Sequence, residues 1–325
     1  MAIVIFRVIL IAAMATASPL AFSDEAQKLP KIGLLWGANP STAKPYDDAL
    51  REGLRDQGYT DGKTVTILTR YANGDSERFP ALLKELIDLG VDVLVVTPKA
   101  VRAALEATST IPIISPGMVD PQKSGFVASL AHPGGNLTGL SSQGSETDSK
   151  RLGLAMELVP KLKRAALLFY APDPDDVASA KDFQTLAHTV GIAIRVYGVR
   201  SADEIQAAIN AILVDSPQLV IVWISYFTLL HRELIFGRLA HRLPMISEGR
   251  DLAEAGALLT YSPDNFDVWK RSAVYLDKIL KGAKPGDLPI EQPTKFILVV
   301  NLKTARALGI SVPQSILLRA DEVIR

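Results

Sequence analysis

The chain has 325 residues, of which 48% are hydrophobic and 22% are charged, and its 35 basic residues balance its 35 acidic ones. This composition is typical of a globular protein with one or two domains and a sizeable core, and the balanced charge argues against nucleic-acid binding or an anionic membrane surface, since both require a clustered positive excess. The absence of cysteine excludes disulfides, thiolate metal sites, cysteine nucleophiles and a lipidated N-terminal cysteine.

The N-terminal segment, residues 1–23, differs in composition from the rest of the chain. A single basic residue, Arg7, precedes an apolar run over residues 8–17, and small residues stand at Ala21 and Ser23. The run is shorter than the roughly 20 residues that span a bilayer, which favours a secretory signal peptide over a membrane anchor. No later stretch approaches that length. We therefore expect a soluble mature protein, retained in the periplasm because no lipid anchor can form on it.

Short apolar runs alternate with amphipathic segments through the first half of the chain. Residues 31–37 (KIGLLWG) and 91–97 (VDVLVVT) have the continuous apolar character of buried parallel strands. Residues 76–89 place their apolar side chains on one helical face, with Ser76 as the predicted N-cap. The predicted order is strand 31–37, helix 46–58, strand 64–71, helix 76–89, strand 91–97, helix 98–107 and strand 113–115.

The second half of the chain repeats this order. Its predicted elements are strand 165–170, helix 174–190, strand 192–199, helix 202–213, strand 219–225, helix 228–241 and strand 245–247. Corresponding strands are separated by 128 to 133 residues, and the short segment IPIIS at 111–115 pairs with LPMIS at 243–247. The alternation predicts parallel sheets with right-handed crossovers. The repeat predicts an α/β protein of two similar Rossmann-like lobes rather than one doubly wound sheet.

Two such lobes place the carboxyl ends of their strands at a shared crevice, where ligands bind in open α/β sheets. The loops just after the predicted strands are therefore the candidate site. These loops are residues 37–39, 97–99, 116–121, 171–173, 225–227 and 248–250.

Residues 120–140 (DPQKSGFVASLAHPGGNLTGL) resemble the hallmark stretch of a family of ABC-transporter substrate-binding proteins. The best-known members of this family are of the tryptophan-binding TrpX type. Further similarity lies at residues 51–59 (REGLRDQGY), 277–285 (DKILKGAKP), 288–309 (LPIEQPTKFILVVNLKTARALG) and 316–324 (ILLRADEVI). The resemblance therefore covers nearly the whole mature chain.

The resemblance implies a type I periplasmic-binding-protein fold, in which several crossing strands join the lobes, with no catalysis and no tightly held cofactor. We expect the first crossing after residues 138–140 and the second near 261–264, with hinges at Thr138-Gly139 and Ser262-Pro263. The first lobe would comprise residues 30–140 and about 265–285. The second would comprise residues 141–264 and about 290–325, although the lobe that holds the C-terminal segment is left open.

Polar residues of the first lobe are the leading ligand candidates. Asp120 follows a strand end and could pair with a ligand ammonium, or it could act only as an Asp-Pro turn residue. Thr97 and Pro98 begin a predicted helix, whose free N–H groups could hold a ligand carboxylate. Lys99 could add affinity for an anionic group, but a solvated side chain is the preferred interpretation, because a cation at a helix start is unfavourable.

Aromatic and charged residues of the second lobe complete the candidate set. Tyr226 and Phe227 could stack on an aromatic or apolar ligand, whereas Trp36 and Trp223 are interpreted as core. Glu248 and Arg250 could clamp a zwitterion or pair only with each other. The candidate ligand-binding residues are Asn39, Thr97, Pro98, Asp120, Thr138, Asp173, Tyr226, Phe227, Glu248 and Tyr261.

The sequence offers no catalytic or metal motif. It lacks the nucleophile elbow, the zinc-protease motif and the phosphate loop, and its four histidines share no metal-binding spacing. An enzyme is therefore disfavoured, and a DNA-binding repressor of similar fold is excluded by the export signal and the lack of an N-terminal DNA-binding segment.

The favoured function is that of a monomeric solute-binding protein of an ABC importer. It would close on an amino acid or related small carboxylate and hand it to a permease in the inner membrane. The alternative is a periplasmic ligand sensor for a membrane receptor kinase.

Overall fold

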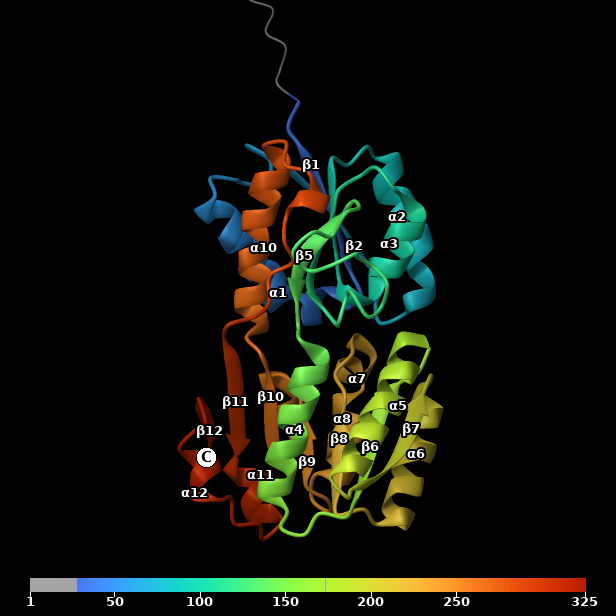
Figure 1. The fold of residues 1–325 in the computed structure, drawn as a ribbon, viewed down its shortest axis with the longest axis vertical. Coiled ribbons are helices and arrows are strands. Elements are labelled where there is room, and N and C mark those ends of the chain that lie inside the picture. Colours follow the sequence, from blue (N-terminus) through green and yellow to red (C-terminus); the bar gives the residue numbers. More distant parts are fainter. Residues whose placement is uncertain (1–27, 173) are drawn as a thin grey trace, which may run out of the picture.

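The computed structural model describes residues 28–172 and 174–325, and two lobes lie one above the other along its longest axis (Figure 1). The predicted signal peptide, residues 1–23, falls outside the described residues. Within those residues, no helix is long and apolar enough to cross a bilayer.

The first lobe contains a five-stranded parallel sheet with the order β2-β1-β3-β4-β5. Its strands are β1 (Lys31–Trp36), β2 (Thr66–Tyr71), β3 (Val93–Val96), β4 (Ile113–Met118) and β5 (Leu137–Ser141). Its helices are α1 (Pro40–Asp56), α2 (Phe79–Asp88), α3 (Val101–Ala107) and α10 (Asn265–Leu280). Successive residues of β1 explain the two layers of helices: Leu34 packs in the cluster with α1 and α10, and Leu35 in the cluster with α2 and α3.

Two helix starts in this lobe differ from the predictions. The first helix begins at Pro40 rather than at residue 46, because Asn39 caps it and proline suits the first turn. The segment from Ser76 begins as a short 3₁₀ turn whose cap is Asp75, so the prediction of Ser76 as the cap is wrong.

The second lobe contains a seven-stranded sheet with the order β12-β11-β10-β9-β8-β6-β7. Its strands are β6 (Arg164–Tyr170), β7 (Ala193–Val199), β8 (Leu219–Val222), β9 (Met245–Ser247), β10 (Leu259–Pro263), β11 (Phe296–Asn301) and β12 (Glu322–Ile324). All neighbours are parallel except β10 and β11, which pair antiparallel. The prediction of parallel sheets is therefore confirmed for the strands of the predicted alternation, and the antiparallel pair lies after them in the chain.

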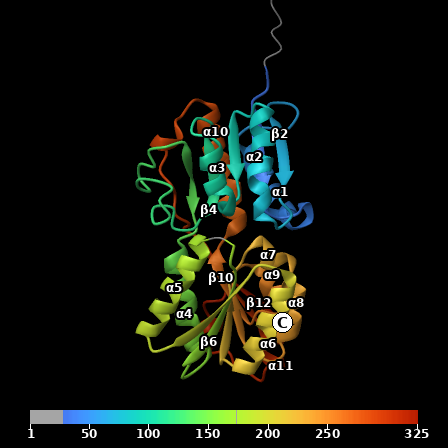
Figure 2. The same cartoon turned by 90° about the vertical axis from the view of Figure 1, so that its right-hand side faces the viewer.

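Helices cover both faces of the second sheet (Figure 2). Helices α4 (Gly144–Leu158) and α5 (Pro174–Thr189) pack on one face, and α6 (Ala202–Asp215) and α8 (Arg232–Leu239) pack on the other. The remaining helices are α7 (Tyr226–Leu230), α9 (Arg250–Ala255), α11 (Leu302–Ala307) and α12 (Gln314–Leu317).

Three described segments run between the lobes (Figure 1). The chain leaves the first lobe after β5 and enters α4, returns from β10 into α10, and leaves again from α10 to β11. Helix α10 packs against α1 in the first lobe.

Candidate functional site

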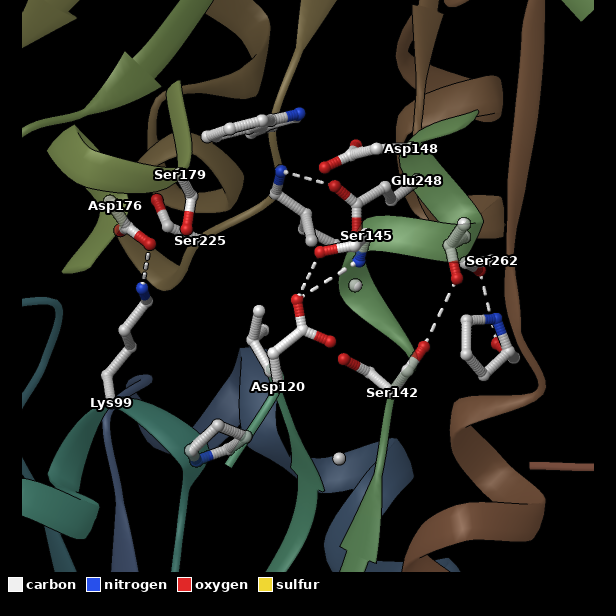
Figure 3. A pocket seen from close by; sticks show the side chains of 18 of the residues that line it. Lys99, Asp120, Ser142, Ser145, Asp148, Asp176, Ser179, Ser225, Glu248 and Ser262 are labelled. Atoms are coloured by element: carbon white, nitrogen blue, oxygen red, sulfur yellow. Dashed lines mark hydrogen bonds and ion pairs between the residues drawn. The ribbon is translucent and has the colours of Figure 1, made fainter. Parts of the chain in front are cut away.

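A cavity of about 420 Å³ lies between the two lobes, at the carboxyl ends of their strands (Figure 3). Loops from both sheets line it, as expected for a ligand crevice in paired α/β lobes. From the first lobe come Pro98 and the turn after β4, and from the second come the start of α4 and the ends of β6, β8 and β9.

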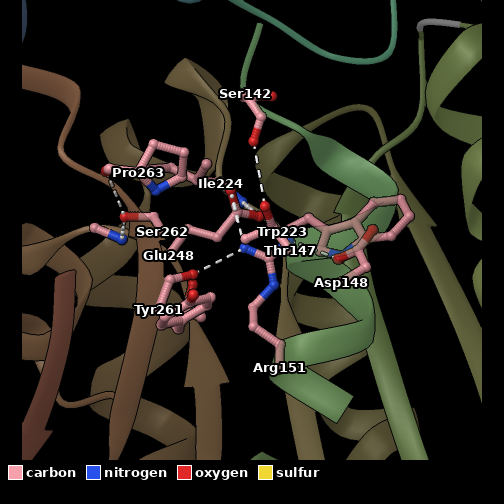
Figure 4. Close-up of polar contacts among 12 residues, drawn as sticks. Ser142, Thr147, Asp148, Arg151, Trp223, Ile224, Glu248, Tyr261, Ser262 and Pro263 are labelled. Atoms are coloured by element: carbon pink, nitrogen blue, oxygen red, sulfur yellow. Dashed lines mark hydrogen bonds and ion pairs between the residues drawn. The ribbon is translucent and has the colours of Figure 1, made fainter. Parts of the chain in front are cut away.

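A buried charge cluster forms the floor of the cavity in the second lobe (Figure 4). Arg151 of α4 is only 3% exposed. Its Nη2 donates to Oδ1 of Asp148 at 2.6 Å, and its Nη1 donates to the Tyr261 carbonyl at 3.1 Å and lies 3.3 Å from Oε2 of Glu248. One guanidinium therefore faces two carboxylates.

Burial dominates the electrostatics of this cluster. Desolvation raises the pKa of Glu248 above its usual value, although Arg151 and the Ile224 backbone N–H oppose the shift. The pKa of Asp148 is raised for the same reason, against the attraction of Arg151. When both carboxylates are ionised, the cluster carries one net negative charge, which a cationic ligand group would stabilise.

Aromatic rings form the wall beside this cluster. Trp223 lies with its ring centroid 5.9 Å from that of Phe169 and 5.8 Å from that of Phe183, and all three residues line the cavity. Trp223 is a buried residue, as the sequence indicated, and it also forms part of the cavity surface. This wall can accept an apolar or aromatic side chain.

Several polar contacts join the lobes across the cavity (Figure 3). Asp120 of the first lobe accepts hydrogen bonds from Ser145 at the start of α4, through the backbone N–H at 3.3 Å and through the hydroxyl group. Lys99 forms an ion pair with Asp176 of α5. The interpretation of Lys99 as a solvated side chain is therefore wrong.

A tyrosine ring from the second lobe packs into the first. Tyr226, at the start of α7, joins the hydrophobic cluster of the first lobe between β1 and α10. A Cβ atom added at Gly37 would lie 2.4 Å from this ring and 3.4 Å from Oγ1 of Thr97. Only glycine at position 37 leaves room for the ring in this arrangement.

The structure gathers part of the predicted ligand set around the cavity. Pro98, Asp120, Tyr226 and Glu248 line it. Phe227 stacks on Tyr170 and lines a second, neighbouring cavity instead.

Other predicted residues lie outside the lining of this cavity. The side-chain oxygen of Asn39 accepts the Thr42 N–H at the start of α1, and the Thr138 hydroxyl donates to the Leu288 carbonyl. The Tyr261 ring stacks on Phe296. Thr97 is fully buried behind Tyr226. Asp173 falls outside the described residues.

Glu248 and Arg250 are not partners, so the interpretation that they pair only with each other is wrong. Arg250 pairs with Glu254 and Glu322 and does not line the cavity, because it begins helix α9 and faces away. Glu248 pairs with Arg151 instead.

Sequence reasoning missed Arg151 and Asp148. The available signal was a cation on the buried stripe of an amphipathic helix, since Arg151 shares that stripe with Thr147, Ala155 and Leu158. A buried charge must be paired, so its position pointed to a nearby carboxylate. The described residues contain no cluster of histidine and acidic side chains suited to a metal ion.

Comparison with known proteins gives consistent matches along the chain. The family model described as "ABC transporter substrate binding protein" matches residues 39–324. The tyrosine-binding protein of Clostridioides difficile (strain R20291) is 24% identical over 281 residues, which are 84% of this chain and 80% of the relative.

Two solved structures share the fold across 91% of this chain and all of theirs. One is an ABC domain from Streptococcus pneumoniae in complex with L-Trp, with 25% identity and a TM-score of 0.84. The other is a conserved domain protein from Vibrio cholerae, with 24% identity and the same TM-score.

Proposed function

We propose that this chain, which belongs to the ABC transporter substrate-binding protein family, binds an apolar or aromatic amino acid between its lobes. It would then deliver this amino acid to an ABC permease. Members of this family are solute-binding proteins and not enzymes. We also propose that the protein resides in the periplasm, after export directed by a signal peptide at residues 1–23.

The single observation that carries the ligand class is the charge cluster beside the aromatic wall. Asp148 and Glu248 share one guanidinium, so a ligand ammonium can supply the missing positive charge through charge-assisted hydrogen bonds. The rings of Trp223 and Phe183 offer an apolar surface next to it. An amino acid with an apolar side chain combines these two features.

Two further observations support an aromatic amino acid. One relative is a tyrosine-binding protein, and the similar structure from Streptococcus pneumoniae is a complex with L-Trp. The hydroxyl groups of Ser142 and Ser225 also line this cavity and can donate to the carboxylate of an amino acid, whatever its side chain.

Binding would close the lobes around the ligand. The contacts of Asp120 with Ser145 and of Lys99 with Asp176 join the lobes only when these are close together. Such contacts favour a two-state mechanism in which ligand shifts the population from open to closed. The closed form would present both outer surfaces to the permease.

The test is a thermal melt of the mature chain, unfolded and refolded to remove ligand, against amino acids, small carboxylates, nucleosides and sugars. At 100 times its dissociation constant, a true ligand adds about 2.7 kcal/mol to the free energy of unfolding, which raises the midpoint by a few degrees. We expect aromatic amino acids to raise it and Glu248→Gln to abolish the rise. A shift with sugars alone would contradict the proposal.

A further inference from the structure

A second cavity of about 320 Å³ adjoins the first and extends along the cleft between the lobes. The ion pair of Lys99 with Asp176 and the ring of Tyr226 line both cavities, so these side chains form the boundary between them. The boundary consists of side-chain ends from both lobes rather than of a continuous backbone wall.

Aromatic residues from both lobes form part of the surface of the second cavity, among charged and polar side chains. Tyr170 and Phe227 of the second lobe stack with their ring centroids 4.4 Å apart at 21°, and both line it. On the opposite side, the Arg102 guanidinium lies 5.0 Å from the centroid of Phe126, and the buried Phe79 completes the first-lobe surface. Rings from both lobes therefore border a space that can accept an apolar side chain.

Charged groups of both signs edge this cavity. Arg102 and Glu106, one helical turn apart on α3, line it and are exposed to solvent. An amide or a zwitterionic end can meet both charges, whereas a purely anionic or purely cationic group would face one of like sign. The first cavity, at about 420 Å³, already falls in the range of complete small-molecule sites.

We propose that the second cavity is a binding subsite for a second apolar aminoacyl group, so that the closed protein holds two such groups in adjoining cavities. The inference rests on the proposed function, because the first group is the amino acid in the charge cluster. The second group can belong to the same molecule, as in an apolar dipeptide, or to a second amino acid. The chemistry at the subsite is the same in both cases.

The test is isothermal titration calorimetry of the refolded chain with L-Trp and with apolar dipeptides such as Trp-Leu. Ala103 lines only the second cavity, so Ala103→Phe fills that subsite, and Ser149→Phe fills the first cavity as the matched control. We expect Ala103→Phe to weaken dipeptide binding at least about tenfold, the effect of 1.4 kcal/mol, and to leave the first L-Trp site within about twofold. Ser149→Phe should weaken both ligands.

The stoichiometry separates the two sources of the second group. One dipeptide per chain, bound more tightly than L-Trp, identifies a single longer ligand, and two L-Trp per chain, reduced to one by Ala103→Phe, identify two molecules. One L-Trp per chain with no advantage for dipeptides would overturn this inference and leave the proposed function standing. No binding of L-Trp or of the dipeptides, together with no shift from any amino acid in the thermal melts, would overturn both. Melts of the ligand-free variants, with Ala103→Leu as a milder substitution, show whether each variant is folded.

Discussion

Arg151 is the residue whose substitution should reduce the stability of the ligand-free protein most. Arg151→Met leaves Asp148 and Glu248 buried without a cation, and breaking a buried pair in this way costs about 3–5 kcal/mol. Arg250→Met is the matched control, because Arg250 also pairs with two carboxylates but is half exposed. It should cost at most about 1 kcal/mol. Urea unfolding measures the loss of unfolding free energy in each variant. Equal losses would contradict the difference expected between the buried and the half-exposed arginine.

Glu248 should make the stability of the ligand-free protein depend on pH. Because burial raises its pKa in the folded state, the unfolded chain loses this proton first as the pH rises. Between the usual carboxyl value and the raised one, the unfolded state binds fewer protons, so stability falls with rising pH by up to about 1.4 kcal/mol per pH unit. Below that window Glu248 is protonated in both the folded and the unfolded state, so it no longer makes stability depend on pH.

Glu248→Gln removes this dependence and provides the measurement. Its free energy of unfolding, minus that of the parent chain, should increase as the pH rises through the window. Denaturant unfolding at several values from about pH 4 upward gives the difference directly. Parallel curves for the two proteins would show that Glu248 titrates normally in the folded state.

The contact between helices α1 and α10 leaves no room for a side chain at Gly53. A Cβ atom there would lie 2.2 Å from the Lys270 carbonyl oxygen, so Gly53→Ala must separate the helices and should cost about 1–3 kcal/mol. Gly153→Ala in α4 is the control, because no heavy atom lies within 4 Å of its added Cβ. It should stabilise the protein by up to about 1 kcal/mol. Thermal melts should move in opposite directions.

Elements with strong local signals were predictable from the sequence. Buried strands such as β1 and β3 are short apolar runs, and α2 has a clear apolar stripe, so both kinds were found within a few residues. The start of α1 was missed because residues 40–45 carry little apolar periodicity, and only the cap at Asn39 fixes it. The antiparallel β11 was not foreseen, since strand direction depends on the path of the preceding crossing.

The candidate site was predictable only in outline. Loops at strand ends identified Asp120, Tyr226 and Glu248, because the fold class fixes where those ends meet. Arg151 lies on a helix rather than in such a loop, and its partners come from distant parts of the sequence. The pairing of Glu248 with Arg151 instead of Arg250 depends on side-chain directions, which no periodicity in the sequence encodes.

At the scale of the whole molecule, Gly37 and Tyr226 couple ligand binding to the approach of the lobes. Gly37→Ala places a methyl group against the Tyr226 ring, and overpacking of about 1–3 kcal/mol in the closed form should weaken ligand binding about tenfold. If the ligand-free protein is open, its melting temperature should change little. The decrease in radius of gyration on ligand binding, measured by X-ray scattering, should become smaller. Tyr226→Ala removes the ring, so in that background Gly37→Ala should cost nothing further. Equal affinity losses in both backgrounds would mean that the ring does not limit closure.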